Sequence, residues 1–386
     1  MPVPSPRLRA ARLAVLAVFF LNGVLVASWF VRIPAVQEGL SLGEGALGVA
    51  LLGSAVGAMA AMPAAGWLIS RFGSRPVVLG AGLCLGASLL LPALAPGLPS
   101  LTLALVALGA SNGALDVSMN AHGVVVEKGY GRQILSSFHA AFSLGGLAGS
   151  ALGGLAAAWG AGVFSHFLAV STLSALAFLP AFAAMLPAGA DAGGGGGPAF
   201  RWPTRALLGL GVVSFCVLLG EGAMADWSAV YLEDTLGTGA GLAAAGYAAF
   251  SLAMTAGRLA GDRLNRRFGP VALVRSGGAL AAAGLGISLA VAHPPAALAG
   301  FACAGLGFSI VFPVALSAAG HSGDMPPGSA IAAVSTAGYL GFLVGPPAIG
   351  FLAELLGLGG ALYLVVALSA TIALLSGAVG SAGKAR

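Results

Sequence analysis

The stretch SWFVRIP, from Ser28 to Pro34, has a counterpart in DWSAVYL, from Asp226 to Leu232. Each stretch is followed by a long apolar run and then by a basic loop that contains glycine. These loops read SRFGSRPV from Ser70 and NRRFGPVALVR from Asn265. In both cases the separation is close to half of the 386 residues, which indicates two tandem structural repeats.

The composition of the chain is that of a membrane protein. Hydrophobic residues make up 58% of it and charged residues only 8%, too few to cover the surface of a soluble domain of this length. Backbone groups in lipid must be paired internally, so apolar runs of about 20 residues are expected to be membrane-spanning helices. We predict twelve of them, at residues 12–33, 45–69, 76–98, 102–126, 133–158, 162–186, 205–232, 241–263, 271–292, 298–319, 328–355 and 358–381.

The basic residues are unevenly distributed over the loops. Nearly all of the 17 Lys and Arg residues lie at the termini or in the even-numbered loops, whereas the odd-numbered loops carry acids such as Glu38, Glu233 and Glu354. This asymmetry predicts that both termini are cytoplasmic. The net charge of +5 therefore reflects membrane topology, and we expect no nucleic-acid partner.

The chain is expected to divide near its middle. The glycine-rich stretch DAGGGGGPAF, residues 191–200, falls between the sixth and seventh predicted helices and has the composition of a flexible tether. We therefore predict an all-α membrane protein with two pseudo-symmetric six-helix halves, residues 1–187 and 205–386, joined by a cytoplasmic linker at 188–204.

The loop GWLISRFGSRPV, residues 66–77, carries a family resemblance. It resembles the signature G-x-x-x-D-R-x-G-R-R of the major facilitator superfamily, with Gly66, Arg71, Gly73 and Arg75 in place and Ser70 where the family has Asp. The resemblance implies twelve helices in two halves that move a solute by alternating access. Because Ser70 is not ionisable, this loop lacks the acidic partner of the ion pair that the family usually forms here.

A second stretch, ALDVSMNAHG at residues 114–123, resembles the fucose permease branch of this superfamily and its bacterial inner-membrane relatives. The resemblance implies a proton symporter of the plasma membrane, with the acid of this segment at Asp116. In that branch the first helix also often carries an acid near its middle, and this chain has Asn22 there.

Polar residues in the fourth predicted helix share one face. Asn112, Asp116 and Asn120 follow at intervals of four residues, so their side chains lie above one another on a helix. An ionisable group within the bilayer is costly, which favours a functional role in binding substrate or a proton. The alternative is a carboxylate held in helix packing by the two asparagines.

The seventh predicted helix offers two more acids. Glu221 lies near its middle, between Ser214 and Ser228 at heptad spacing, and is a candidate for proton coupling or ligand binding. Asp226 lies closer to the outside, at a place nearly equivalent to that of Arg32 in the first repeat. We expect Arg32 and Asp226 to form an outer gate between the halves, unless both are interfacial charges that extend toward water.

Further candidates have two plausible roles each. Trp29 and Trp227 could form an apolar platform for the C–H face of a sugar or anchor helix ends at the interface. Arg258 could take part in transport or in an inner-gate salt bridge, and His139 could relay protons or be structural. The substrate- or proton-binding set that we predict is completed by Asn22 and by Tyr339, a possible hydrogen-bond donor.

These observations predict a secondary active transporter of a small polar solute, such as a sugar or another metabolite, with proton coupling. One alternative is proton-antiport efflux of drugs or metabolites, because GGLAGSALGG at residues 145–154 resembles the antiporter signature G-x-x-x-G-P-x-x-G-G with serine for proline. From another class, a non-transporting receptor or sensor on the same fold stays open, because both signature loops lack the aspartate.

Several kinds of chemistry have no motif in the sequence. There is no phosphate-binding loop for ATP, no Cys/His spacing for a metal, and no nucleophile elbow of a hydrolase. We expect no enzyme activity, no cofactor and no metal. The expected partners are a small-molecule substrate, protons and the lipid bilayer, and the expected state is a monomer.

Overall fold

The computed structural model describes residues 5–131, 134–187, 207–320, 322 and 327–381. The predicted linker at 188–204 lies outside them. The chain groups into two compact units, of which unit 1 contains residues 1–42 and 50–196 and unit 2 contains residues 43–49 and 197–386. The predicted boundaries of the two halves stay a prediction, and each unit is described by itself.

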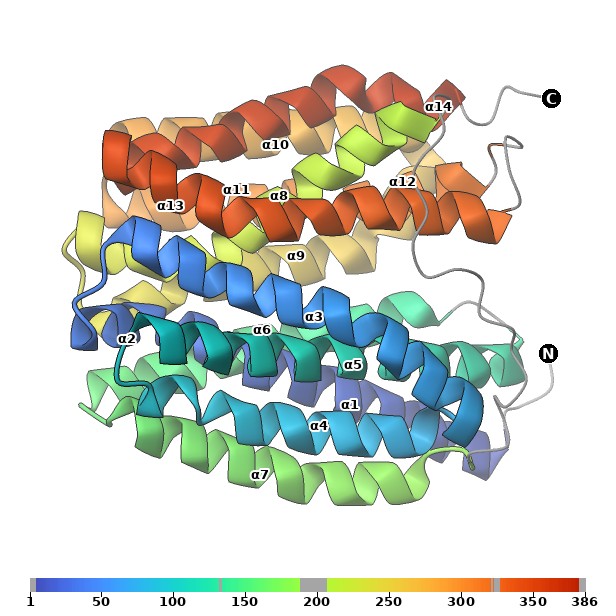
Figure 1. Ribbon diagram of the computed structural model, residues 1–386. Coiled ribbons are helices and arrows are strands. Elements are labelled where there is room, and N and C mark those ends of the chain that lie inside the picture. Colours follow the sequence, from blue (N-terminus) through green and yellow to red (C-terminus); the bar gives the residue numbers. More distant parts are fainter. Residues whose placement is uncertain (1–4, 132–133, 188–206, 321, 323–326, 382–386) are drawn as a thin grey trace. The chain divides into compact units, whose positions relative to one another are not determined.

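Within the described residues, unit 1 is built of helices joined by short turns (Figure 1). Residues 44–49, at the start of α3, group with unit 2. The elements are α1 (Pro6–Phe30), α2 (Ile33–Gly39), α3 (Glu44–Phe72), α4 (Ser74–Leu89), η1 (Pro92–Leu94), α5 (Leu98–Tyr130), α6 (Leu135–Ala158) and α7 (Val163–Ala184).

Unit 2 is helical throughout its described residues as well. Its elements are α8 (Leu208–Val230), the π-helical turn η4 (Tyr231–Thr235), α9 (Ala240–Phe268), α10 (Pro270–Val291), α11 (Pro294–Phe308), α12 (Val311–Gly320), α13 (Pro327–Leu374), η5 (Leu375–Gly377) and α14 (Ala378–Ser381).

The prediction of twelve membrane spans agrees with the structure. Eleven helical segments among the described residues are long and apolar enough to cross a bilayer, and the last of them, Ala333–Gly380, is 48 residues long. Within it Gly357 has φ 70° and ψ 159°, outside the helical region, and the chain reverses direction there (Figure 1). That segment therefore supplies two spans, which brings the total to twelve.

Glycines bring pairs of helices into backbone contact. A methyl group at Gly145 of α6 would overlap the backbone carbonyl of Phe20 on α1, and one at Gly23 would overlap that of Phe142. In unit 2, Gly341 of α13 meets the carbonyl of Phe215 on α8 in the same way. Close approach of this kind maximises van der Waals contact between helices that gain little from hydrophobic burial in lipid.

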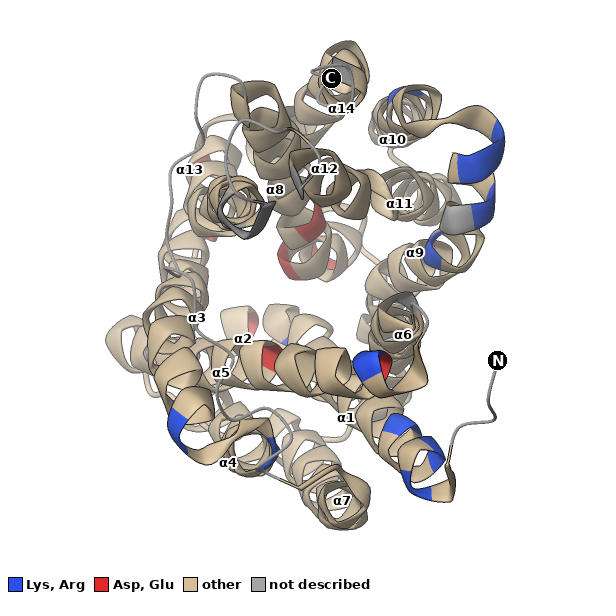
Figure 2. Ribbon diagram, turned by 90° about the vertical axis from the view of Figure 1, so that its right-hand side faces the viewer, with Lys and Arg blue, Asp and Glu red and all other residues tan. Residues whose placement is uncertain are grey.

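Most basic residues of each unit lie near helix ends, whereas Arg258 lies inside α9. In unit 1, Arg7 and Arg12 lie in the first turns of α1, Arg71 and Arg75 flank the α3–α4 turn, and Lys128 lies in the last turn of α5. Figure 2 shows such coloured ends on α1, α4 and α9. Because successive helices run in opposite directions, these residues collect at one end of unit 1, in keeping with the loop asymmetry, and Arg32 lies at the other end.

Candidate functional site

The polar face predicted on α5 contains a short internal hydrogen-bond network. The Asn120 side-chain amide donates to the Asp116 carboxylate at 3.1 Å and to the Asp116 backbone carbonyl at 2.9 Å. The Asn112 side-chain oxygen is buried and has no hydrogen-bond partner among the described residues. The spacing of four residues therefore brings Asp116 and Asn120 into contact, as predicted, and leaves Asn112 with an unused acceptor.

Asn22 of α1 points toward α5. Its side-chain nitrogen lies 3.7 Å from the sulfur of Met119, its side-chain oxygen has no partner in the described part of the chain, and the residue is only 2% exposed. A thioether is a weak acceptor, so this amide is poorly satisfied. A buried polar group in that condition costs free energy, and a role for Asn22 in binding substrate or a proton stays a prediction.

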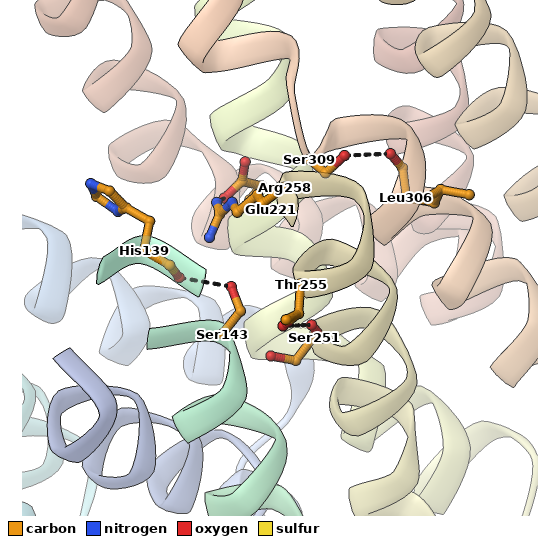
Figure 3. A network of polar contacts seen from close by, with 8 residues as sticks. All are labelled: His139, Ser143, Glu221, Ser251, Thr255, Arg258, Leu306 and Ser309. Atoms are coloured by element: carbon orange, nitrogen blue, oxygen red, sulfur yellow. Dashed lines mark hydrogen bonds and ion pairs between the residues drawn. The ribbon is translucent and has the colours of Figure 1, made fainter. Parts of the chain in front are cut away.

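The acid of α8 has a cationic partner in the structure. Arg258 Nη2 of α9 lies 3.7 Å from Glu221 Oε2, and the two side chains are 18% and 17% exposed. Figure 3 shows the two side chains turned toward one another. Thr255 and Ser251 lie on the same helix as Arg258, with the Thr255 hydroxyl donating to the Ser251 carbonyl at 2.8 Å.

Tyr247 and Asp226 extend this charged group. Tyr247, one turn before Ser251 on α9, is 7% exposed and lies within electrostatic range of Glu221, Asp226 and Arg258. The half-buried Asp226 lies on α8, five residues after Glu221. We name Glu221, Asp226, Tyr247 and Arg258 the α8–α9 cluster. The cluster contains two acidic residues and one arginine, and its members come from two neighbouring predicted membrane spans.

Arg32 is held within its own unit. It begins α2, is 4% exposed, and donates from Nη2 to the carbonyl of Ala161 in the turn between α6 and α7. Asp226 belongs to unit 2, so the outer gate between Arg32 and Asp226 stays a prediction.

The aromatic candidates occupy different environments. Trp29 is 2% exposed and Trp227 is fully buried, with an indole nitrogen that has no hydrogen-bond partner among the described residues. Tyr339 of α13 is half-buried and packs against the ring of Phe342. Roles for these three side chains in substrate binding stay predictions.

His139 is half-buried on α6. Its ring meets Phe19 of α1 edge-on, with 5.3 Å between the ring centroids, and the Ser143 hydroxyl donates to its backbone carbonyl (Figure 3). A role for His139 in proton relay stays a prediction.

The signature loop is built differently from the family pattern. The Ser70 hydroxyl donates to the Trp67 carbonyl of its own helix at 2.7 Å. This serine therefore forms a hydrogen bond within α3. Gly73 has φ 79°, a conformation that favours glycine, and it starts α4. Arg75 donates to the Phe182 carbonyl of α7 at 3.1 Å and lies over the Phe182 ring, which ties this loop to the end of α7.

One polar residue has a role that sequence analysis missed. His122 of α5 is 1% exposed and bonds through both ring nitrogens, to the Ser74 hydroxyl at 2.8 Å and to the Leu186 backbone N–H at 3.2 Å. The partners lie 48 and 64 residues away, so no local pattern pointed to them. The only signal was a histidine inside an apolar helix, six residues before the basic Lys128 near the helix end.

The glycine motif that suggested antiport lies on α6 and packs against α1. Gly149 would meet the backbone of Val24, and Gly153 would meet the Val31 side chain, if either carried a methyl group. These glycines therefore serve helix contact in this structure. No group of three or more His, Cys, Asp or Glu residues that could hold a metal occurs in the part of the chain that the structure describes.

The sequence of this chain matches a known protein family. The family model described as Major Facilitator Superfamily matches residues 13–327. An MFS-type transporter of Yersinia pestis is 37% identical over 359 residues, which cover 92% of each chain. The membrane protein MosC of Rhizobium meliloti is 35% identical over 358 residues, covering 92% of this chain and 86% of MosC.

Solved structures share the fold at low sequence identity. The nucleoside transporter NupG superposes with a TM-score of 0.72 at 13% identity, covering 97% of this chain and all of that one. A bacterial homologue of the human lysosomal transporter Spinster, in an inward-facing and occupied conformation, gives a TM-score of 0.75 at 14% identity. That match covers 100% of this chain and 98% of the other.

Proposed function

The chain belongs to the Major Facilitator Superfamily, a family of membrane transporters, and we propose that it moves a small polar solute across the bacterial inner membrane with protons as the driving ion. The proposed mechanism is alternating access, with the solute bound near the middle of the bilayer. Asp116 would carry the proton, and the α8–α9 cluster would respond to the solute.

The observation that carries this proposal is the difference between the partners of two membrane acids. Glu221 lies beside a guanidinium, whereas the hydrogen-bond partner of Asp116 is the neutral amide of Asn120. A carboxylate without a cation is costly in the bilayer unless it is protonated, so Asp116 is the better site for reversible protonation. Arg258 offsets part of the cost of burying a charged Glu221, a compensation that Asp116 does not receive from Asn120.

Asn120 gives Asp116 a partner in both of its states. A carboxamide can donate through nitrogen to the charged carboxylate and can accept through oxygen from the neutral acid. Loss or gain of the proton therefore changes the charge of this face while its hydrogen bond is retained. Coupling requires that the inward-open and outward-open conformations differ in their preference for that proton.

The solute class follows from the unused polar atoms. Asn112 and Asn22 each have a side-chain oxygen without a partner among the described residues, and both are hydrogen-bond acceptors. A solute with hydroxyl or N–H donors would satisfy them. Sugars, polyols and nucleosides fit this chemistry, whereas an apolar drug would leave the oxygens unsatisfied.

The test begins with a thermal-shift screen of sugars, polyols, nucleosides and apolar drugs on purified protein, because a ligand that binds the folded state raises Tm. A hit is then tested in proteoliposomes for uphill uptake driven by an imposed pH gradient. Uptake of a polar hit that collapses with a protonophore supports the proposal. A polar ligand that binds but is never transported would indicate a sensor, and drug-dependent counterflow of protons would indicate efflux.

A further inference from the structure

His122 connects three segments at the basic end of unit 1. It lies on α5, its Nδ1 is 2.8 Å from the hydroxyl of Ser74 at the start of α4, and its Nε2 is 3.2 Å from the backbone nitrogen of Leu186, just beyond α7. Ser74 belongs to the signature loop. Beyond Leu186 the chain leads toward the residues that join the two units.

The bond to Leu186 fixes the protonation state of the ring. A backbone N–H is always a donor, so Nε2 must offer a lone pair and carry no hydrogen. The remaining proton of the neutral ring is then on Nδ1, beside the Ser74 oxygen, which accepts it. A second proton would turn Nε2 into a donor that faces the N–H of Leu186, and the bond would be lost.

Two charged side chains near this end of unit 1 have partners of their own. His122 is 1% exposed. Arg75 of α4 donates a hydrogen bond to the Phe182 carbonyl close to the same end of α7. Glu127, the acid of the last turns of α5, is occupied by the backbone N–H groups of Ile134 and Leu135, at 2.6 and 2.9 Å. The other charged or titratable side chains on the packed elements near this end are Arg7, Arg9 and Arg12 of α1, Arg71 of α3, Lys128 and Tyr130 of α5 and His139 of α6.

We propose that His122 is a positioning residue that holds the end of α7 to the signature loop only while its ring is neutral. Acidification on the side of the basic loops would protonate Nε2, release Leu186, and free the end of α7 from the signature loop. Transport would then depend on the pH of that compartment separately from any proton that is carried with the solute.

The test follows the Leu186 amide directly and needs no substrate. Hydrogen–deuterium exchange of the peptide containing residues 182–187 is measured between about pH 8 and about pH 5.5, the range in which histidines gain a proton. The intrinsic pH dependence of amide exchange is subtracted. After that correction, exchange of the Leu186 amide in the wild-type protein is expected to rise by about tenfold or more at the acidic end, because a buried N–H has lost its acceptor.

Two variants separate this role from simple packing. Glutamine can accept from Leu186 and cannot be protonated in this range, so His122→Gln should keep protection at both pH values. Ser74→Ala removes the Nδ1 partner alone and should keep the acidic rise. Equal protection of the wild-type amide across the range, or an acidic rise that persists in His122→Gln, would overturn the proposal.

A second measurement holds even where the His122 variant does not fold. Nitrogen-15 histidine spectra of the wild-type protein should show one buried ring that carries its proton on Nδ1 at about pH 8 and on both nitrogens at about pH 5.5. A ring protonated on Nε2 at the higher pH would contradict the bond to Leu186. Because neither experiment uses a solute or a gradient, its outcome is independent of whether Asp116 couples transport to protons.

Discussion

Arg258 of α9 and Glu221 of α8 are separated by 3.7 Å between Nη2 and Oε2, and this contact joins the two helices at the centre of the α8–α9 cluster. At that distance the pair is held more by charge than by a well-formed hydrogen bond. A solute that offers Glu221 or Arg258 a better partner can therefore displace the contact. We therefore expect the pair both to stabilise unit 2 and to respond to a bound solute.

Removal of either member of this pair should destabilise the protein. Glu221→Gln and Arg258→Gln each remove one charge of a mostly buried ion pair and leave the other, whereas the double variant removes both. A double-mutant cycle should give a coupling free energy of about 1–3 kcal/mol, with the double variant more stable than the sum of the single effects predicts. The free energies are measured by denaturant unfolding in detergent, and additive effects would show that the pair does not interact.

Asp116→Asn should uncouple transport from protons. The substitution keeps the size of the side chain and its bond to Asn120 but removes the ionisable group. Uphill accumulation of the solute found by screening should vanish, while exchange of labelled for unlabelled solute should survive, since exchange needs no net proton movement. Uphill, pH-dependent uptake by Asp116→Asn would refute the assignment and pass the role to Glu221.

Two glycine substitutions should have opposite consequences. Gly145→Ala places a methyl group on the Phe20 carbonyl, so α6 must separate from α1 at a cost of about 1–3 kcal/mol or more. The matched control is Gly80→Ala on α4, where nothing lies within 4 Å of the added methyl and a better helix former is gained. The Tm of each variant is measured, and Gly145→Ala should lower it while Gly80→Ala should not. Equal shifts would show that α1 and α6 are not in close backbone contact.

Membrane orientation can be tested with alkaline phosphatase fusions, which are active only outside the cytoplasm. The distribution of Lys and Arg predicts active fusions at Glu233 and Glu354 and inactive fusions at Lys128 and Asp191. A fusion to a cytoplasmic reporter at the same four positions supplies the control, because it should give the inverse pattern. Equal activity at all four positions would contradict the predicted orientation.

Much of the fold follows from hydropathy and repetition, while helix ends do not. The run predicted at 102–126 corresponds to α5, Leu98–Tyr130, and the run at 241–263 corresponds to α9, Ala240–Phe268. Both helices continue past the apolar run because backbone hydrogen bonding does not stop where the side chains become charged. The run predicted at 12–33 includes a turn at Val31 and Arg32, which the apolar pattern gave no reason to expect.

Contacts within one helix were predictable from spacing, and contacts between helices were not. Asn120 meets Asp116 because residues four apart are neighbours on a helix. Glu221 meets Arg258 only because α8 packs on α9, which no local pattern specifies.

The two serines at heptad spacing on either side of Glu221 are both fully buried. Ser214 lies beside Gly338 of α13 and Ser228 beside Gly246 of α9. The heptad spacing therefore could not identify the helices that these serines contact, and their common face with Glu221 stays a prediction.

Gly357 reverses the chain between two spans without an intervening loop, and this has a consequence for biosynthesis. We expect the two segments on either side of it to enter the bilayer as a joined hairpin, since the predicted runs 328–355 and 358–381 are separated by two residues. A bulkier residue at φ 70° would strain that reversal, so we expect substitutions there to lower the yield of inserted protein before they alter any step of the transport cycle.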